Sequence, residues 1–261
     1  MEYYGEYGRH DLPWRTKPTA YRVLVSEIML QQTQVSRVIP FFKKWIHKFP
    51  SWRALAKAPQ SEVLMHWKGL GYNSRALRLQ KLAKIVTQEY RGRLPQDYQT
   101  LLKLPGIGPY TAGAVRAFAF NLYTPIIETN IRRIFIHHFF RGENTVSDTE
   151  IFEIMNDMGE IDNPRIWYAA LMDYGATLPK IIKHNPNKQS KHYTKQSKFV
   201  GSDRQIRGRI LDILLQQTNH RISKEKIFQE LGNEHERYQN IFNQLEKENF
   251  IKQTKKTLIL K

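Results

Sequence analysis

The sequence contains no cysteine among its 261 residues. This absence excludes disulfide bonds, thiolate metal sites, iron–sulfur clusters and cysteine nucleophiles. The chain also has no apolar run that approaches the ~20 residues needed by a membrane-spanning helix. No secretory signal pattern opens it. We therefore expect a cytoplasmic protein with no membrane association and no metal or other cofactor.

Acidic residues are scarce relative to basic ones. The chain has 24 Asp and Glu residues against 41 Lys and Arg, so its formal net charge is +17. Such a balance predicts a polyanionic partner, and nucleic acid is the first candidate. The excess is steepest in residues 180–261, which hold 18 basic and 8 acidic residues. The apolar fraction of 41% is sufficient for a buried core, in one large domain or two smaller ones.

Apolar periodicity predicts an almost entirely helical chain up to about residue 177. Apolar side chains recur at helical spacing in most segments, and none of these segments reads convincingly as a strand. Pro40, Ser51 and Ser61 each stand where a helix is expected to begin. Residues 1–19 are polar and aromatic, and we interpret them as an irregular arm laid over this domain.

The last third of the sequence differs in character. Residues 178–204 alternate lysines with Asn, Gln, Ser, His and Tyr, which predicts either a solvated linker or a basic strap that contacts phosphates. Residues 205–261 predict three helices followed by a β-hairpin, the arrangement of a winged helix. Winged helices serve DNA binding, protein contacts or simple packing. We therefore predict three parts: a domain over 1–177, a basic loop over 178–204 and a winged-helix-like α+β domain over 205–261. The lysines of the basic loop are Lys180, Lys183, Lys188, Lys191, Lys195 and Lys198.

The motif Leu-Pro-Gly-Ile-Gly-Pro at 104–109 predicts a tight turn between two helices. Gly106 and Gly108 are expected to adopt backbone angles that other residues avoid. The helix that follows would direct its first N–H groups out of the turn, where a phosphate binds well. The carboxylate of Glu128 comes about twenty residues later. The stretch favours an enzyme that grips a nucleic-acid backbone, although many helical hairpins use such a turn without binding anything.

Residues 12–176 resemble the adenine DNA glycosylase (MutY) branch of the helix-hairpin-helix DNA glycosylase superfamily, which also contains endonuclease III. The resemblance implies an all-α, two-lobed helix-hairpin-helix glycosylase fold with the active site between the lobes. The matching stretches are LPWR (12–15), YRVLVSEIMLQQTQV (21–35), GLGYNSRA (69–76), LPGIGPYTAGAV (104–115), ETNIRR (128–133) and MDYGA (172–176).

The resemblance implies a pair of catalytic carboxyl groups. Glu27 lies within an apolar helical pattern, which is expected to raise its pKa. It holds the position of the glutamate that protonates the leaving adenine and handles the water. The family's second carboxylate is the aspartate of a D-G-N motif, which stabilises the sugar cation. This chain has Glu128-Thr129-Asn130 there, so the charge is kept but displaced by about one methylene. The resemblance places Asn130, which is kept, among the catalytic residues as well. Alternative interpretations are a helix cap or a surface ion pair with Arg132 or Arg133 for Glu128, and a buried salt bridge for Glu27.

The residue after the hairpin implies the type of reaction. Bifunctional members of the superfamily carry a lysine there, which cuts the DNA strand through a Schiff base. Tyr110 occupies that position, so we expect a monofunctional DNA N-glycosylase without lyase activity. The resemblance also assigns Trp14 and Arg15 to the base pocket, although Trp14 and Tyr72 could be ordinary core aromatics. The residues it assigns to DNA binding are Leu30, Gln32, Tyr72, Gly106, Gly108 and Thr111.

Two features depart from the family pattern. Most relatives bind a [4Fe–4S] cluster through cysteines just after the segment that matches MDYGA, whereas this chain has the basic loop. Adenine DNA glycosylases usually also carry a Nudix-like domain that recognises 8-oxoguanine, and residues 205–261 are too short and too helical to form it. We expect a base excision repair enzyme that acts as a monomer on double-stranded DNA, at the nucleoid, and removes adenine opposite 8-oxoguanine or guanine. The alternatives are a thymine or uracil glycosylase for T:G or U:G mismatches, and a non-catalytic protein that binds DNA damage.

Overall fold

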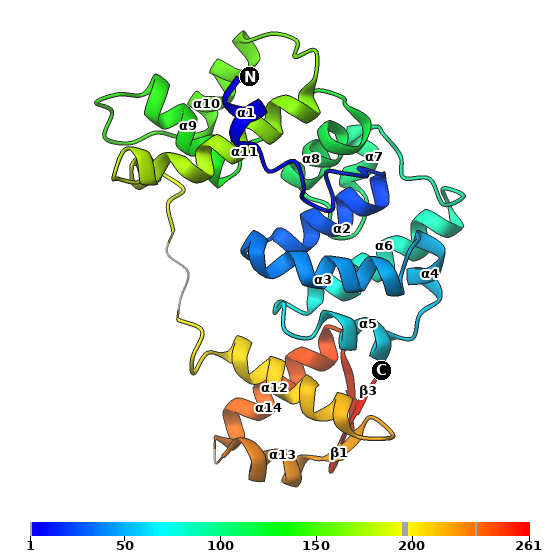
Figure 1. Cartoon of the computed structure of the whole chain (residues 1–261). Helices are drawn as coiled ribbons and strands as arrows, with labels where there is room; N and C mark the ends of the chain where they lie inside the picture. Colours follow the sequence, from blue (N-terminus) through cyan, green and yellow to red (C-terminus); the bar gives the residue numbers. More distant parts are fainter. Residues whose placement is uncertain (1, 195–197, 233) are drawn as a thin grey trace. The chain divides into compact units, whose positions relative to one another are not determined.

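The computed structural model describes residues 2–194, 198–232 and 234–261. Helices dominate it, and the single sheet of the described residues has three short strands, so the predicted fold class is confirmed (Figure 1). The chain forms two compact units: residues 1–32 with 90–195, and residues 33–89 with 196–261. Lys195 of the basic loop lies outside the described residues. None of the described helices is long and apolar enough to cross a membrane.

The first unit is helical. Its elements are α1 (Glu2–Tyr7), α2 (Ala20–Leu30), α7 (Tyr98–Leu102), α8 (Pro109–Phe120), α9 (Thr129–Phe139), α10 (Asp148–Asp157), α11 (Pro164–Ile181) and the 3-10 helix η1 (Pro186–Gln189). Helix α2 packs on α8, and α9 packs on α11 and η1. The predicted irregular arm is wrong over residues 2–7, which form α1 against α11. Contacts with α11 favour the helix there, although six residues alone would not hold one.

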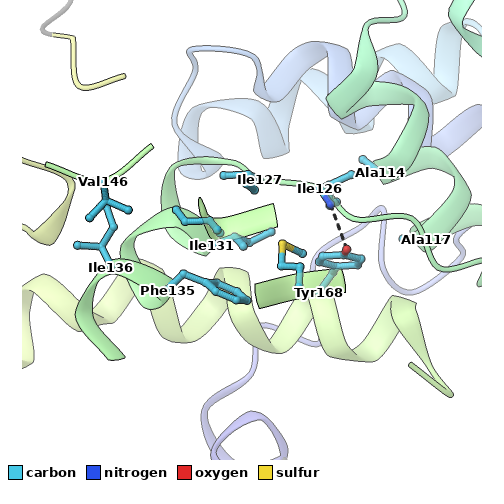
Figure 2. Close-up of a cluster of buried hydrophobic side chains, with 11 residues drawn as sticks. Ala114, Ala117, Ile126, Ile127, Ile131, Phe135, Ile136, Val146 and Tyr168 are labelled. Carbon is cyan, nitrogen blue, oxygen red and sulfur yellow. Dashed lines mark hydrogen bonds between the residues drawn. The ribbon is translucent and has the colours of Figure 1, made fainter. Parts of the chain in front are cut away.

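The core of this unit surrounds the segment that leads to Glu128 (Figure 2). The hydroxyl of the buried Tyr168 accepts a hydrogen bond from the N–H of Ile126 at 3.1 Å and donates to the carbonyl of Thr124 at 2.7 Å. Gly113 of α8 faces the same segment, because a Cβ there would lie 2.2 Å from the Ile126 side chain. The backbone just before Glu128 is therefore held by a buried tyrosine and by close packing.

The second unit begins with α3 (Val35–Lys48), α4 (Trp52–Lys57), α5 (Gln60–Trp67) and α6 (Ser74–Gln88). The Ser51 side chain caps α4 by accepting from the N–H of Ala54 at 3.2 Å, as expected. The predicted start at Pro40 is wrong, because α3 begins at Val35 and contains this proline. The lost hydrogen bond is offset by the buried face of α3, which includes Trp45. Helix α5 begins at Gln60, one residue before the predicted Ser61.

The winged-helix-like part of the second unit comprises α12 (Asp203–Gln216), β1 (Arg221–Ser223), α13 (Lys224–Leu231), α14 (His235–Lys247), β2 (Ile251–Gln253) and β3 (Thr257–Leu260). The predicted three helices and hairpin are present. Strand β1 was not predicted. It pairs antiparallel with β3 at Ile222 and Leu258, so the strand order is β1-β3-β2. A strand of three residues has too little alternation to be seen in the sequence.

Candidate active site

Helices α2 and α8 bring the first pair of predicted site residues together. Glu27 is on α2, with 7% of its surface exposed, and Tyr110 is in the first turn of α8. The Tyr110 hydroxyl donates a hydrogen bond to Oε2 of Glu27 at 3.0 Å, although 83 residues separate the two. The alternative interpretation of Glu27 as half of a buried salt bridge is therefore replaced by a carboxyl–phenol pair.

The surroundings of this pair raise the pKa of both groups. Burial raises the pKa of Glu27 to about 7, the Tyr110 hydrogen bond opposes that rise, and the negative charge of Glu128 adds to it. Burial, together with the charges of Glu27 and Glu128, raises the pKa of Tyr110 well above its usual value. Near neutral pH a large share of Glu27 is therefore a neutral acid, and Tyr110 remains a neutral phenol.

Glu128 begins α9 and caps it. Its Oε1 accepts from the N–H groups of Asn130 at 2.7 Å and Ile131 at 2.9 Å, and its Oε2 accepts from Nδ2 of Asn130 at 3.2 Å. Burial raises the pKa of Glu128, and these hydrogen bonds oppose the rise. The charge of Glu128 in turn raises the pKa of Glu27. The cap considered from the sequence is thus present, and the negative charge of the capping group favours the protonated form of Glu27.

Arg133 extends this arrangement away from Glu128. Its Nη1 donates to Oδ1 of Asn130 at 2.8 Å and to the carbonyl of Gly175, and its Nε donates to Oδ1 of Asn185 at 3.2 Å. Hydrogen bonds therefore run from Glu128 through Asn130 and Arg133 to Asn185. Arg132, the other basic residue considered as an ion-pair partner for Glu128, binds Asp148 instead, at 2.7 Å.

The basic loop continues α11 and then packs on α9. The side chain of Asn187, which is 4% exposed, donates to the carbonyl of Thr129 at 2.8 Å. Val146 and Ser190 form an isolated parallel bridge. The donors of this segment are amide, hydroxyl, amine and imidazole groups, with no thiolate, so they do not fit the [4Fe–4S] cluster that the resemblance implies. They instead support the residues next to Glu128. Among the described residues, no group of three acidic or imidazole side chains could hold a metal ion.

In the hairpin between α7 and α8, one of the two glycines has the predicted backbone conformation. Gly106 has a φ of +84°, which favours glycine. Gly108 has a φ of −98°, which other residues also adopt, so that part of the prediction is wrong. Gly108 is exposed, and a Cβ there would meet nothing within 4 Å. The carbonyl of Gly108 accepts the first hydrogen bond within α8, from the N–H of Ala112 at 2.9 Å. The N–H groups before Ala112 therefore have no acceptor within the helix. Thr111 is 4% exposed, and its assigned role in binding DNA stays a prediction.

Of the two residues assigned to the base pocket, Trp14 is buried and Arg15 is held by a carboxylate in the middle of α11. Trp14 is 8% exposed. The guanidinium of Arg15 donates to both carboxylate oxygens of Asp173, at 2.6 and 2.9 Å, and Arg9 also binds this carboxylate. Leu30 ends α2 half-buried, and Gln32 follows it exposed with a φ of +55°. These contacts place the residues, and their roles in binding a base or DNA stay predictions.

Sequence reasoning missed Asp173 and Gly175, which explain why the MDYGA stretch matters. Asp173 is 3% exposed and fixes the arm that carries Arg15. Gly175 lets α11 approach the start of α9, because a Cβ there would lie 2.3 Å from the carbonyl oxygen of Asn130. Two signals were available: an acidic residue in an otherwise apolar helical pattern, and a glycine in the middle of a helix.

Residues 25–160 match the family model described as HhH-GPD superfamily base excision DNA repair protein. The chain belongs to this superfamily. The resemblance to its adenine DNA glycosylase branch is also confirmed. The adenine DNA glycosylase of Mycolicibacterium smegmatis is 37% identical over 229 residues, which cover 82% of this chain and 78% of the relative.

The chain is also similar to a second adenine DNA glycosylase and to a solved glycosylase structure. The adenine DNA glycosylase of Buchnera aphidicola subsp. Baizongia pistaciae is 39% identical over 187 residues, 71% of this chain. The chain spans only about half the length of this relative, 53%. The solved structure of a thermostable thymine-DNA glycosylase superposes with a TM-score of 0.60 at 29% identity, covering 71% of this chain and 89% of that one. The helix-hairpin-helix glycosylase fold thus agrees with both kinds of comparison.

Proposed function

We propose that this chain is a monofunctional DNA glycosylase that hydrolyses the N-glycosidic bond of adenine mispaired with 8-oxoguanine or guanine in double-stranded DNA. The observation that carries the proposal is the buried Glu27, whose pKa of about 7 keeps it partly protonated beside Tyr110. Membership of the superfamily and similarity to adenine DNA glycosylases over most of the chain support it.

The chemistry follows from two carboxyl groups with different roles. An adenine leaves a sugar readily only if it is protonated as the bond breaks, and Glu27 is a neutral acid at the pH where this must happen. The sugar then carries positive charge, which an ionised Glu128 would stabilise. Once its proton is gone, Glu27 is a base that can activate water. The same assignment of acid and carboxylate serves glycoside hydrolysis in general.

Tyr110 supports hydrolysis rather than strand cleavage. A lyase needs an amine at this position to form a Schiff base with the sugar. The Tyr110 phenol is engaged with Glu27, and its raised pKa disfavours a nucleophilic phenolate. We therefore expect an abasic site as the product. Since all groups named here come from one chain and none needs a bound metal, we expect the enzyme to act as a monomer without a cofactor, in the cytoplasm where its DNA substrate lies.

The DNA contacts assigned by resemblance belong to the same proposal. Gly106, Gly108 and the first N–H groups of α8, including that of Thr111, would hold a phosphate. Leu30 and Gln32 would fill the gap left by the flipped base, and Tyr72 would lie beside the opposite base. Trp14 and Arg15 would line the pocket for the flipped base, with Arg15 fixed by Asp173.

A panel of duplexes tests the reaction. The protein is incubated with A:8-oxoguanine, A:G, T:G and U:G duplexes, and abasic sites are then cleaved with alkali. Cleavage of the adenine strands alone is the expected result. Cleavage of T:G or U:G alone would replace adenine by a pyrimidine substrate, which the similarity to a thymine-DNA glycosylase makes the second candidate. Strand breaks without alkali would contradict the monofunctional assignment, and tight binding without cleavage would favour a damage-binding protein.

Two substitutions test the roles of the carboxyl groups. Glu27→Gln should abolish excision and retain DNA binding, because the amide has the same shape but cannot donate the proton. Glu128→Asp should match or exceed the wild-type rate if the longer side chain is merely tolerated. A much slower Glu128→Asp enzyme would show that the site is built around glutamate, which the two backbone hydrogen bonds to its Oε1 would explain. Misplacement by ~1 Å costs about 100-fold in rate.

A further inference from the structure

The turn that joins α5 to α6 has an unusual backbone. Gly69, Gly71 and Tyr72 all have positive φ, of +98°, +74° and +48°. For a tyrosine this conformation is uncommon, and such positions persist where the surrounding structure holds them. Within this unit, Arg37 donates to the carbonyl of Gly69, and the indole of Trp67 donates to the carbonyl of Gly71 at 3.1 Å.

Helix α12 of the winged-helix-like part contacts both ends of this turn. Asp212 lies 3.4 Å from the amino group of Lys68, and Arg204 donates to the hydroxyl of Tyr72. Arg204 and Asp212 are eight residues apart, which places them on the same face of α12 and about 12 Å apart along it. One face of α12 therefore spans the turn from Lys68 to Tyr72.

Two guanidinium groups lie over the ring of Tyr72. The Cζ atom of Arg204 is 5.3 Å from the ring centroid, and that of Arg75 is 5.5 Å from it. Arg75 is buried and donates to the carbonyls of Leu70 and Gly71 at 3.2 and 2.9 Å. The two guanidinium groups therefore hold the ring of Tyr72 in place by cation–π contacts.

The remainder of the winged-helix-like part is less suited to reading DNA by itself. The helix that would enter a groove, α14, has two acidic and two basic residues and so carries no net charge. Its Gln239 and Asn243 are hydrogen-bonded to each other and to Gln253 of β2, at 2.8 to 3.0 Å. The amide groups of Gln239 and Asn243 are thus engaged within the domain.

We propose that Arg204 is a positioning residue for Tyr72, and that the winged-helix-like part sets discrimination of the opposite base by holding this turn. The part thereby does through α12 what a separate base-reading domain would do by direct contact. The inference rests on the proposed function, in which Tyr72 lies beside the base opposite the target.

Binding by the full-length protein tests the inference without requiring excision. Two duplexes carry 2′-fluoro-deoxyadenosine, which resists hydrolysis, opposite either 8-oxoguanine or cytosine, and fluorescence anisotropy gives the Kd of each. The discrimination ratio is the Kd of the cytosine duplex divided by the Kd of the 8-oxoguanine duplex. Arg204→Ala should reduce this ratio about three- to tenfold, the size expected for a lost cation–π contact and hydrogen bond. Arg209→Ala removes an exposed arginine of the same helix, and should weaken both complexes equally and leave the ratio unchanged.

A double-mutant cycle separates positioning from a general loss of charge. In a Tyr72→Ala background, Arg204→Ala should no longer change the ratio, whereas independent effects would add. A ratio unaffected by Arg204→Ala, raised by it, or already near one in the wild type would overturn the inference. If the ratio falls as expected but no duplex with an ordinary adenine is cleaved, the proposed function fails while the positioning role stands. Thermal unfolding of each variant confirms that the fold is retained.

Discussion

Replacing Glu27 with glutamine should stabilise the protein at alkaline pH, and the size of the effect follows from the site. Burial raises the pKa of Glu27 from 4.5 to about 7 in the folded chain. In the unfolded chain the carboxyl has its ordinary pKa, so between pH 4.5 and 7 the folded form binds a proton that the unfolded form has released. The stability contributed by this proton is fully present below pH 4.5 and is lost as the pH rises through 7.

The magnitude comes from the difference between the two pKa values. One pH unit corresponds to about 1.4 kcal/mol, so ionising Glu27 in the folded state costs roughly 3 kcal/mol above pH 7. Glutamine has no charge at any pH and avoids this cost. The difference in unfolding free energy between Glu27→Gln and the wild type should therefore grow by about 2–3 kcal/mol in favour of the variant between pH 4.5 and 8.

Urea unfolding of both proteins at pH 4.5, 6 and 8 measures this difference. Glu153→Gln is the matched control, since it makes the same substitution at an exposed position of α10. It corrects for the removal of one negative charge from a chain of net charge +17. If Glu27→Gln is no more stable relative to the wild type at pH 8 than at pH 4.5, the buried carboxyl is not a neutral acid and the proposed proton donor is wrong. Excision by Glu27→Gln, measured in parallel, should be undetectable.

Three further substitutions test the contacts around the site. Tyr110→Phe removes the hydrogen bond that lowers the pKa of Glu27, so the alkaline limb of the single-turnover rate should move up by about one pH unit. Gly175→Ala places a Cβ against the carbonyl of Asn130 and should cost about 1–3 kcal/mol of unfolding free energy, with slower excision because Glu128 is displaced. Asp173→Asn leaves two arginines without their carboxylate and should lower the unfolding free energy by about 3 kcal/mol.

Two of these variants, Tyr110→Phe and Gly175→Ala, have a control substitution that makes the same chemical change where the contact is absent. Tyr7→Phe removes a hydroxyl from an exposed side chain, and its pH profile should match the wild type. Gly208→Ala adds a methyl group within α12 where no atom lies within 4 Å, and should be neutral or stabilising by up to about 1 kcal/mol. A shift of the pH limb downward in Tyr110→Phe, or a Gly175→Ala protein as stable as Gly208→Ala, would contradict the contacts described here.

The sequence by itself determined the helical class, most element positions and the family. These features depend on local signals: apolar spacing sets the helices, Ser51 caps one of them, and the glycines and prolines of 104–109 form the hairpin. The motif stretches also pointed to Glu27 and Glu128 as site residues, because each lies in a stretch that matches the family. A local signal gave the wrong helix start where packing opposed it. Pro40 predicted a start, but it lies inside α3, which is stabilised by its buried face.

Only the tertiary structure decided how these residues act together. The hydrogen bond from Tyr110 to Glu27 joins two helices far apart in sequence, and the pKa of Glu27 depends on burial that no local pattern specifies. The roles of Gly175 and Asp173 depend likewise on elements brought close by folding. The contact of Arg204 with Tyr72 spans 132 residues. The physical reason is common to all: periodicity and capping are set by neighbours along the chain, whereas desolvation, close approach and long-range pairing are set by which surfaces pack.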